Sequence, residues 1–278
     1  MSDRECSNSS CTNESCSGCA HAKGSGIPKE ELNSHSRIYN VIGIVSGKGG
    51  VGKSTVTSMI ARKLAGAGYR VGIMDGDVTG PSIPKMFGLK GVLDAEDNEI
   101  IPAVTSEGIK VVSMNLLLDD EEECVVYRGP VIAGIIKQFW SDVRWGELDY
   151  LLIDMPPGTG DVPLTVYQSL PVDGIVIVTS PQELVKMIVM KACDMARKMN
   201  IRVLGMVENY SYFECPDCKK IVHIFGDSKV DEIAEELKVP VIAKLPVLPD
   251  MAGLADRGES APKEMDIDIS FLGGRLES

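Results

Sequence analysis

Three features are scarce in this 278-residue chain, and each scarcity excludes a class of protein. No apolar run approaches the roughly 20 residues that a membrane-spanning helix needs, and the N-terminus lacks the charged-then-apolar pattern of a secretory signal. Bases are outnumbered, with 28 Lys and Arg against 40 Asp and Glu and a formal net charge of -12. Nucleic acid and anionic membranes would repel such a protein. We therefore expect a cytoplasmic protein with neither a nucleic-acid nor a membrane partner.

Large apolar residues are also almost absent from residues 1–37, which are rich in Ser, Asn, Gly and Cys. Such a segment cannot bury enough surface to offset the entropy that it would lose on ordering. The rest of the chain raises the overall hydrophobic content to 44%, enough for one sizeable core. We expect a flexible, cysteine-containing tail over 1–37 and one domain over 38–278.

Short apolar runs alternate with helical patterns from about residue 38 onwards. The expected strands are Ile38–Val45, Arg70–Met74, Tyr150–Ile153, Gly174–Val178 and Arg202–Val207. The expected helices are Ser54–Gly66, Val131–Val143 and Glu183–Met199. Strands that are apolar all round are typical of parallel sheets covered on both faces. The sequence therefore predicts a three-layer α/β fold with a mostly parallel sheet, with ligands at the carboxyl ends of the strands.

A phosphate-binding loop follows the first expected strand. Ser46–Thr55 has the sequence SGKGGVGKST, which contains the spacing Gly47-x4-Gly52-Lys53-Ser54 between a strand and a helix. Glycines let backbone N–H groups turn towards phosphate oxygens, and the helix N-terminus adds a positive dipole end. The residues expected to bind ATP are Gly47, Lys48, Gly49, Gly50, Val51, Gly52, Lys53, Ser54 and Thr55. This motif makes the fold a P-loop NTPase fold, with Lys53 on the β- and γ-phosphates and Ser54 on Mg²⁺.

Five polar residues follow expected strands or stand in the loop itself. Asp154 ends a strand and is placed to hold Mg²⁺. One acid of the pair Asp75 and Asp77, more plausibly Asp77, positions the attacking water unless the pair is a solvated turn. Lys48 is either a solvated charge or a lysine that acts on the nucleotide of a second subunit, as an arginine finger does. Asn209 either contacts the adenine edge or forms a turn.

Gly158–Asp161, with the sequence GTGD, is expected to be a switch segment that senses the γ-phosphate. It comes directly after the Met-Pro-Pro run that follows Asp154. Binding and hydrolysis would order this segment differently.

The eight cysteines are more plausibly metal ligands or redox groups than disulfides in a reducing compartment. Cys215 and Cys218 have the spacing for one metal centre, but a zinc ion or a cubane cluster needs four ligands. Two copies of the chain in a symmetric dimer would supply four. The alternatives are a redox pair and a structural zinc shared between subunits. Cys124 and Cys193 are expected to be small buried residues.

The tail holds the other four cysteines, Cys6, Cys11, Cys16 and Cys19. Cys16 and Cys19 have ligand spacing, so the tail is a candidate for a [4Fe–4S] cluster. A zinc ion and free thiols are the alternatives.

The motifs together resemble the Mrp/ApbC group of P-loop ATPases that carry and transfer iron–sulfur clusters. The similar stretches are SGKGGVGKST at Ser46, DGDVTGPSIPKMFG at Asp75, RGPVIAGIIKQF at Arg128, WGELDYLLIDMPPGTGDVPLT at Trp145, VTSPQE at Val178 and VENYSYFECPDC at Val207. Two features depart from the group: Tyr210 stands where it usually has Met, and the tail cysteines lack the long spacing of the eukaryotic scaffold branch.

The resemblance implies a homodimeric ATPase that passes a [4Fe–4S] cluster to apo-proteins and hydrolyses ATP slowly. It implies that Lys48 and Lys53 act on phosphate, that Asp77 and Asp154 serve water and Mg²⁺, and that the Cys215/Cys218 pairs hold a bridging cluster. Two other functions share parts of the pattern. A positioning ATPase of the cell-division or partition type would need a membrane helix or a DNA-binding patch. A dimeric electron-transfer ATPase would retain its cluster instead of passing it to an acceptor.

Overall fold

The computed structural model describes residues 28–78, 80, 82–118, 129–181, 185–250, 253–254, 257–259 and 265–272. Cys6, Cys11, Cys16, Cys19 and Cys124 lie outside the described residues, so the predictions made for them stay predictions. Within the described part, no helix has both the length and the apolar character that crossing a membrane requires.

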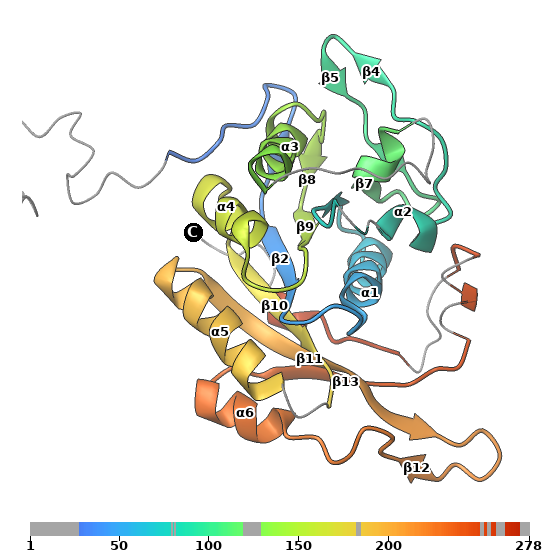
Figure 1. Cartoon of the computed structure of the whole chain (residues 1–278). Coiled ribbons are helices and arrows are strands. Elements are labelled where there is room, and N and C mark those ends of the chain that lie inside the picture. Colours follow the sequence, from blue (N-terminus) through green and yellow to red (C-terminus); the bar gives the residue numbers. More distant parts are fainter. Residues whose placement is uncertain are drawn as a thin grey trace, which may run out of the picture.

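Helices and strands alternate along the chain, as Figure 1 shows. The helices are α1 (Lys53–Gly66), α2 (Ile83–Met86), α3 (Gly129–Ser141), α4 (Asp161–Ser169), α5 (Val185–Lys198) and α6 (Val230–Leu237), with 3-10 turns at Met114–Leu116 and Ser270–Leu272. The strands of the main sheet are β2 (Val41–Ser46), β3 (Val71–Asp75), β6 (Ala103–Val104), β7 (Lys110–Val112), β9 (Tyr150–Asp154), β10 (Gly174–Thr179), β11 (Arg202–Glu214), β12 (Ile221–Val222) and β13 (Val241–Pro246). Two small ribbons pair β1 (Arg37–Ile38) with β8 (Glu147–Leu148) and β4 (Ala95–Glu96) with β5 (Glu99–Ile100).

The main sheet has the order β12-β11-β10-β2-β9-β3-β7-β6, and β13 lies beside β11. All neighbouring strands run parallel except β12 and β6, which are antiparallel to β11 and β7. The central strands β2, β3, β9 and β10 are buried throughout, which explains their continuous apolar sequences. The predicted mostly parallel sheet is confirmed.

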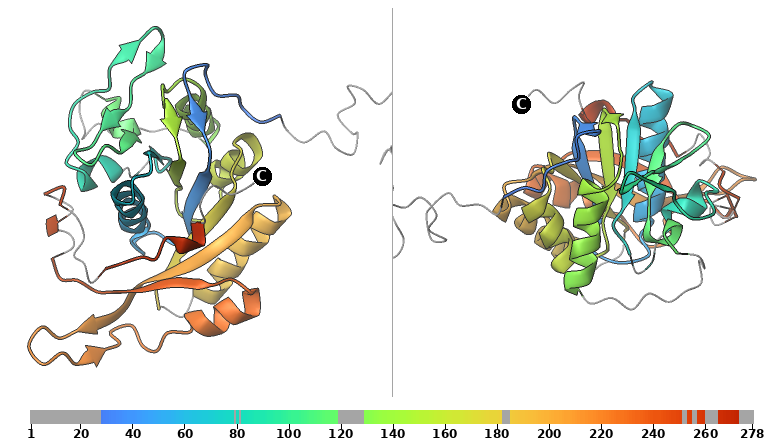
Figure 2. Two further views of the ribbon diagram at one scale, coloured as in Figure 1. Left: turned by 180° about the vertical axis from the view of Figure 1, so that it is seen from behind. Right: turned by 90° about the horizontal axis from the view of Figure 1, so that it is seen from above.

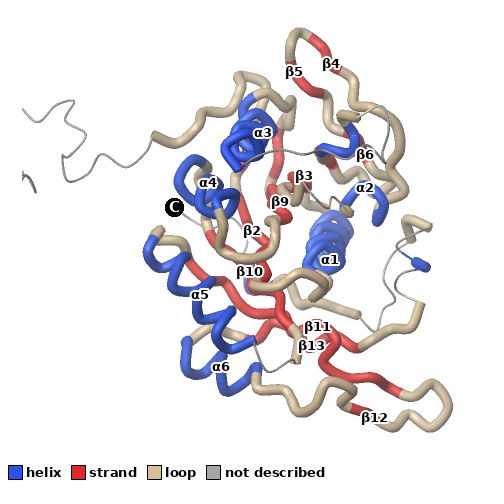
Figure 3. Tube along the Cα trace, in the orientation of Figure 1, coloured by secondary structure: helices blue, strands red, loops and turns tan. Residues whose placement is uncertain are grey.

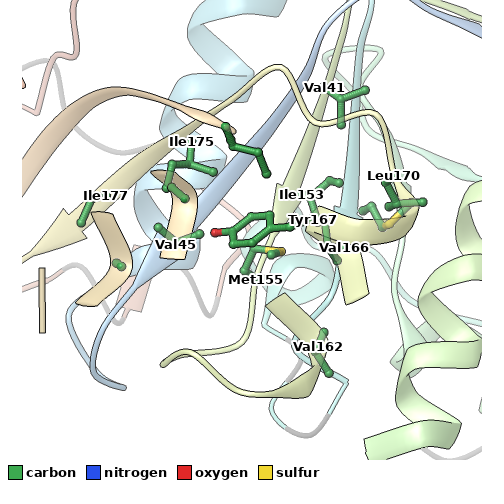
Figure 4. Packing of buried hydrophobic residues seen from close by; sticks show 14 of the residues in the cluster. Val41, Val45, Ile153, Met155, Val162, Val166, Tyr167, Leu170, Ile175 and Ile177 are labelled. Carbon is green, nitrogen blue, oxygen red and sulfur yellow. The ribbon is translucent and has the colours of Figure 1, made fainter. Parts of the chain in front are cut away.

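Helices cover both faces of the sheet (Figure 2), which makes the three predicted layers. One buried cluster joins the sheet to α3, α4, α5 and α6, and a second joins it to α1, α2 and the segment 265–272. Figure 4 shows part of the first cluster, where Tyr167 of α4 lies among Val45, Met155 and Ile175. These two cores hold the carboxyl ends of β2, β3 and β9 at one edge of the sheet.

Several element boundaries differ from the prediction. The expected strand Ile38–Val45 is interrupted at residues 39–40, because residues 37–38 pair with β8 rather than with the main sheet. The expected strand Arg202–Val207 is wrong at its end, since β11 continues to Glu214. Strands β7 and β13 were not predicted, and both are short and contain a lysine.

Residues 28–36 are attached to the domain, although their composition groups them with the tail. The Lys29 ammonium donates to the carbonyls of Tyr167 and Leu170 at 2.7 and 2.8 Å. The Trp140 indole donates to the carbonyl of Glu30 at 2.9 Å. The domain boundary at 37/38 stays a prediction, but these contacts attach the last part of the predicted tail to α3 and α4.

Candidate functional site

The phosphate-binding loop connects the end of β2 at Ser46 to the start of α1 at Lys53. Gly50 and Gly52 have φ angles of 79° and 78°, a left-handed conformation that glycine adopts at little cost. A side chain at Gly47 would place its Cβ 1.3 Å from the Ile188 Cγ2 atom of α5. The glycines therefore serve the shape of the loop as well as its approach to an anion.

A cleft of about 240 Å³ opens beside this loop. It is lined by Ser46, Gly49, Gly50, Gly52, Lys53, Ser54, Thr55, Asp77, Gly80, Ser82, Met86 and Pro157. Seven of these residues were predicted from the sequence as nucleotide or catalytic residues. The free N–H groups at the start of α1 can donate hydrogen bonds to the oxygens of a phosphate chain. The arrangement fits a nucleotide polyphosphate.

Asp154 is the centre of the polar network under the loop. Its Oδ2 atom accepts hydrogen bonds from the Lys53 ammonium and the Ser54 hydroxyl, both at 2.6 Å. Its Oδ1 atom accepts from the Thr57 hydroxyl at 2.6 Å. Asp154 and Lys53 are both buried, with 0% and 7% of the side chain exposed. The carboxylate and the Ser54 hydroxyl are hard oxygen donors of the kind that Mg²⁺ prefers.

Thr57 is a member of this network that sequence reasoning missed. It lies four residues after Lys53 on α1, so both side chains are on one face of the helix. That spacing from the motif lysine was the available signal.

Asp75 and Asp77 have different roles in the structure. Asp75 is fully buried and lies beside Asp154 in the sheet register. Burial, and then the charge of Asp154, raises the pKa of Asp75 to about 8. Its carboxyl oxygens accept from the Ser113 hydroxyl at 3.1 Å and from the Asp77 N–H at 3.2 Å.

Asp77 is half-buried and lines the cleft, whereas Asp75 lies beneath it. Asp77 is therefore the acid of the pair that a water molecule in the cleft can reach. Its role in positioning that water stays a prediction.

Lys48 is exposed, and it is not among the described residues that line the cleft. The segment 158–161, predicted to be a switch, lies next to the loop, because the Gly158 N–H donates to the Ser46 carbonyl at 2.8 Å. The exposure of Lys48 and the position of the segment 158–161 are both compatible with another molecule binding at the outer side of the loop. Neither tests the role predicted for Lys48.

Asn209 lies within β11 rather than after it, and it is 1% exposed. Its Nδ2 atom donates to the Val51 carbonyl of the loop at 3.0 Å. Its Oδ1 atom accepts from the Tyr210 N–H at 3.0 Å. The predicted contact with adenine therefore stays a prediction, while the contact with the loop is a finding that the sequence did not suggest.

Cys215 and Cys218 lie at the turn between β11 and β12, which projects from the sheet edge in Figures 1 and 3. The turn is closed by the Cys215 N–H, which donates to the Lys220 carbonyl at 3.0 Å, and by the Lys219 N–H, which donates to the Cys215 carbonyl at 2.9 Å. Cys215 is half-buried and Cys218 is exposed. Hydrogen bonds from the backbone N–H groups of Cys218 and Asp217, and from the Cys218 thiol, lower the pKa of Cys215.

Two thiols can supply two of the four ligands that a tetrahedral metal site needs. Among the described residues, no group of three or more His, Cys, Asp and Glu side chains is arranged to hold a metal ion. Cys193 differs from the pair: it lies on α5 and is buried as predicted, and burial raises its pKa.

Comparison with known proteins identifies the family. Residues 37–270 match the family model described as the NUBPL iron-transfer P-loop NTPase. The chain belongs to this family of iron-transfer P-loop NTPases. The iron–sulfur cluster carrier protein of Clostridium perfringens is 45% identical over 262 residues, which cover 90% of this chain and 92% of the relative. The protein of the same name from Saccharolobus solfataricus is 49% identical over 220 residues, covering 78% and 74%.

Solved structures agree with the fold of this family member. A nucleotide-binding protein of Archaeoglobus fulgidus, in complex with ADP and with cobalt, superposes with a TM-score of 0.73 at 45% identity and covers 82% of this chain and 90% of its own. The septum site-determining protein MinD of Pyrococcus horikoshii, complexed with Mg-ADP, has a TM-score of 0.58 at 22% identity, covering 82% and 89%. The second likeness concerns the P-loop NTPase fold alone.

Proposed function

We propose that this protein is an ATP-dependent carrier that binds an iron–sulfur cluster and transfers it to apo-proteins. The observation that carries the proposal is the presence of two sites in one domain: a phosphate-binding cleft with a buried lysine–aspartate network, and an exposed pair of cysteines on a projecting hairpin. The relatives named as iron–sulfur cluster carriers are similar over most of their length. The protein would act in the cytoplasm, where its thiols stay reduced.

The cleft would hold ATP with Mg²⁺. The loop N–H groups and Lys53 would bind the phosphates, and Ser54 and Asp154 would hold the metal ion, which supplies charge neutralisation on the phosphate oxygens. Lys53 is paired with Asp154 in this structure. A bound phosphate would draw the ammonium away from the carboxylate, which would then be available to the metal ion.

Hydrolysis would be slow and would depend on a second subunit. Asp77 would accept a hydrogen bond from the attacking water and orient it towards the γ-phosphate. Lys48 would reach the partner's nucleotide and stabilise the charge that develops in the transition state. The switch segment 158–161 would adopt different positions before and after loss of the γ-phosphate.

The cluster is cargo, and its ligands would come from two chains. Cys215 and Cys218 supply two thiolates, and a [4Fe–4S] cluster needs four. A symmetric homodimer brings two such pairs to one axis. The lowered pKa of Cys215 favours the thiolate that binds iron, and the exposure of Cys218 leaves the cluster open to attack by thiols of an acceptor protein.

Cluster transfer tests the proposal directly. The full chain, with Cys6, Cys11, Cys16 and Cys19 changed to Ser so that only the hairpin can supply a cluster, is reconstituted anaerobically with iron and sulfide. It is then mixed with an apo-protein whose activity needs a [4Fe–4S] cluster. We expect the acceptor to gain activity with the parent protein and not with the Cys215→Ser/Cys218→Ser variant. Cys193→Ser is the matched control, since Cys193 is buried away from the hairpin. Normal transfer by the double variant would refute the proposal.

A further inference from the structure

Strand β11 contacts both candidate sites through neighbouring residues. The Asn209 amide donates to the Val51 carbonyl of the phosphate-binding loop at 3.0 Å. The contact is close: a Cβ atom on Gly52 would lie 2.2 Å from Nδ2 of Asn209 and 3.2 Å from the Tyr210 hydroxyl oxygen. The loop and the strand are therefore packed with no room for a methyl group between them.

Glu208, the residue before Asn209, connects the strand to the cysteine hairpin. Its side chain is 1% exposed. The Ser211 hydroxyl donates to Oε2 at 2.6 Å, and the Ser228 hydroxyl donates to Oε1 at 2.7 Å. Ser211 precedes the hairpin and Ser228 follows it, so one carboxylate joins both ends of the segment 212–227 that carries Cys215 and Cys218.

The backbone directly after Glu208 and Asn209 has an unusual conformation. Tyr210 has a φ of 60°, a left-handed value that is uncommon for an aromatic residue. Its N–H is held by the Asn209 side chain at 3.0 Å. The register between β11 and β13 shifts between Glu208 and Tyr212. The strand is thus irregular at the place where it touches the loop, while it pairs with β10 as far as Glu208 and with β12 from Phe213.

A movement of the loop would therefore be transmitted to the hairpin. Successive residues of a strand point to opposite faces, so Asn209 and Glu208 connect the loop on one face to the hairpin base on the other. Any displacement of the Val51 carbonyl when the loop takes up phosphate strains or breaks its bond to Asn209. The adjacent Glu208 carboxylate would then shift relative to the Ser211 and Ser228 hydroxyls.

We propose that Glu208 and Asn209 are positioning residues that couple the nucleotide cleft to the cysteine hairpin. Nucleotide binding changes how tightly Cys215 and Cys218 hold iron, and iron loading changes nucleotide affinity by the same factor, because such coupling is reciprocal. This inference rests on the proposed function, since it needs a nucleotide in the cleft and iron at the thiols.

The test measures release of iron from the reconstituted protein to a coloured chelator, with and without saturating Mg-ATP. The parent is the full chain with Cys6, Cys11, Cys16 and Cys19 changed to Ser, so that only the hairpin site is measured. We expect Mg-ATP to change its release rate at least about fivefold, the lower end of typical coupling. In Asn209→Ala and Glu208→Gln the ratio of the two rates falls towards one, while iron bound per chain stays that of the parent.

Two further variants keep the test decisive. Ser228→Ala removes the hydroxyl that donates to one Glu208 oxygen. It is used in place of Glu208→Gln if circular dichroism and thermal unfolding show that the buried change at Glu208 prevents folding. Glu235→Gln makes the same chemical change at an exposed position of α6 and keeps the parent's ratio. As the reciprocal measurement, iron loading shifts the ATP dissociation constant of the parent by the factor by which ATP changes its iron affinity, and does not shift that of Asn209→Ala.

Each other outcome has a definite meaning. Variants that keep the parent's rate ratio overturn the coupling role while the proposed function stands. If Mg-ATP does not change the rate of iron release from the parent, the coupling role is overturned as well. A parent that binds no iron at the hairpin refutes the proposed function, and the inference with it.

Discussion

The contact between Gly52 and Asn209 predicts a large difference between two alanine substitutions in the same loop. Gly50 and Gly52 have nearly the same φ, 79° and 78°. A Cβ on Gly50 meets nothing within 4 Å, whereas one on Gly52 lies 2.2 Å from the Asn209 Nδ2 atom. Gly50→Ala is therefore a matched control that carries the backbone strain without the collision.

The magnitudes follow from these contacts. Left-handed backbone costs a residue with a Cβ about 1–2 kcal/mol, and both variants incur that cost. In Gly52→Ala the buried Asn209 side chain must also turn away and lose its bond to the Val51 carbonyl. A hydrogen bond lost with its partner left buried costs about 1–3 kcal/mol more. We expect Gly52→Ala to lower the free energy of unfolding by about 1–3 kcal/mol more than Gly50→Ala does.

Urea unfolding of the nucleotide-free protein measures both values, with two probes to check that the transition is cooperative. The two substitutions are then repeated in an Asn209→Ala background, where the methyl group no longer meets the Asn209 amide. There the excess cost of Gly52→Ala should fall to less than half. Equal costs for the two glycines, or an excess that persists without the Asn209 side chain, would refute the packing argument.

Three further predictions concern the polar residues of the cleft. The pKa of Asp75 is raised from 3.8 to about 8, so between these values the folded state keeps a proton that the unfolded state has lost. The free energy of unfolding should fall as pH rises through this window, and a pH series of urea titrations should show a flatter dependence for Asp75→Asn. Thr57→Val removes a hydrogen bond from the buried Asp154 carboxylate and should cost about 1.5–3 kcal/mol in the same assay; no loss would contradict the network. Lys48→Ala should slow ATP hydrolysis at least about a thousandfold if the lysine acts like an arginine finger, while calorimetry shows unchanged Mg-ADP binding; an unchanged rate would leave Lys48 as a solvated charge.

Much of the fold follows from the sequence because its central strands are buried on both faces. The strands around Ile44, Ile73 and Leu152 have no solvent-exposed face that would carry polar side chains, so each is a short continuous apolar run. The phosphate-binding loop was equally predictable, because its glycines and Lys53 have a spacing that few other structures require. Edge strands are different: β13 contains Lys244, which is exposed and pairs with Asp231, and its apolar pattern is correspondingly weak.

The candidate site was predicted in part, and its gaps have a physical cause. Lys53 and Asp154 could each be assigned from a local pattern, Lys53 from the phosphate-binding loop and Asp154 from the apolar strand that it ends. Glu208 contacts Ser228, which lies 20 residues away along the chain, and Asn209 contacts Val51, which lies 158 residues away. Contacts of that kind arise from the packing of β11 beside the loop, and no local pattern encodes them.

The central claim is that two chains share one iron–sulfur cluster through Cys215 and Cys218, and native mass spectrometry tests it most directly. The full chain, with its four tail cysteines changed to Ser, is reconstituted anaerobically with iron and sulfide and sprayed from volatile buffer. We expect a dimer carrying the mass of one [4Fe–4S] cluster, which corresponds to two irons per chain at about four thiolate ligands per cluster. The Cys215→Ser/Cys218→Ser variant should carry none. A cluster on the monomer, or an undiminished cluster in that variant, would contradict the account.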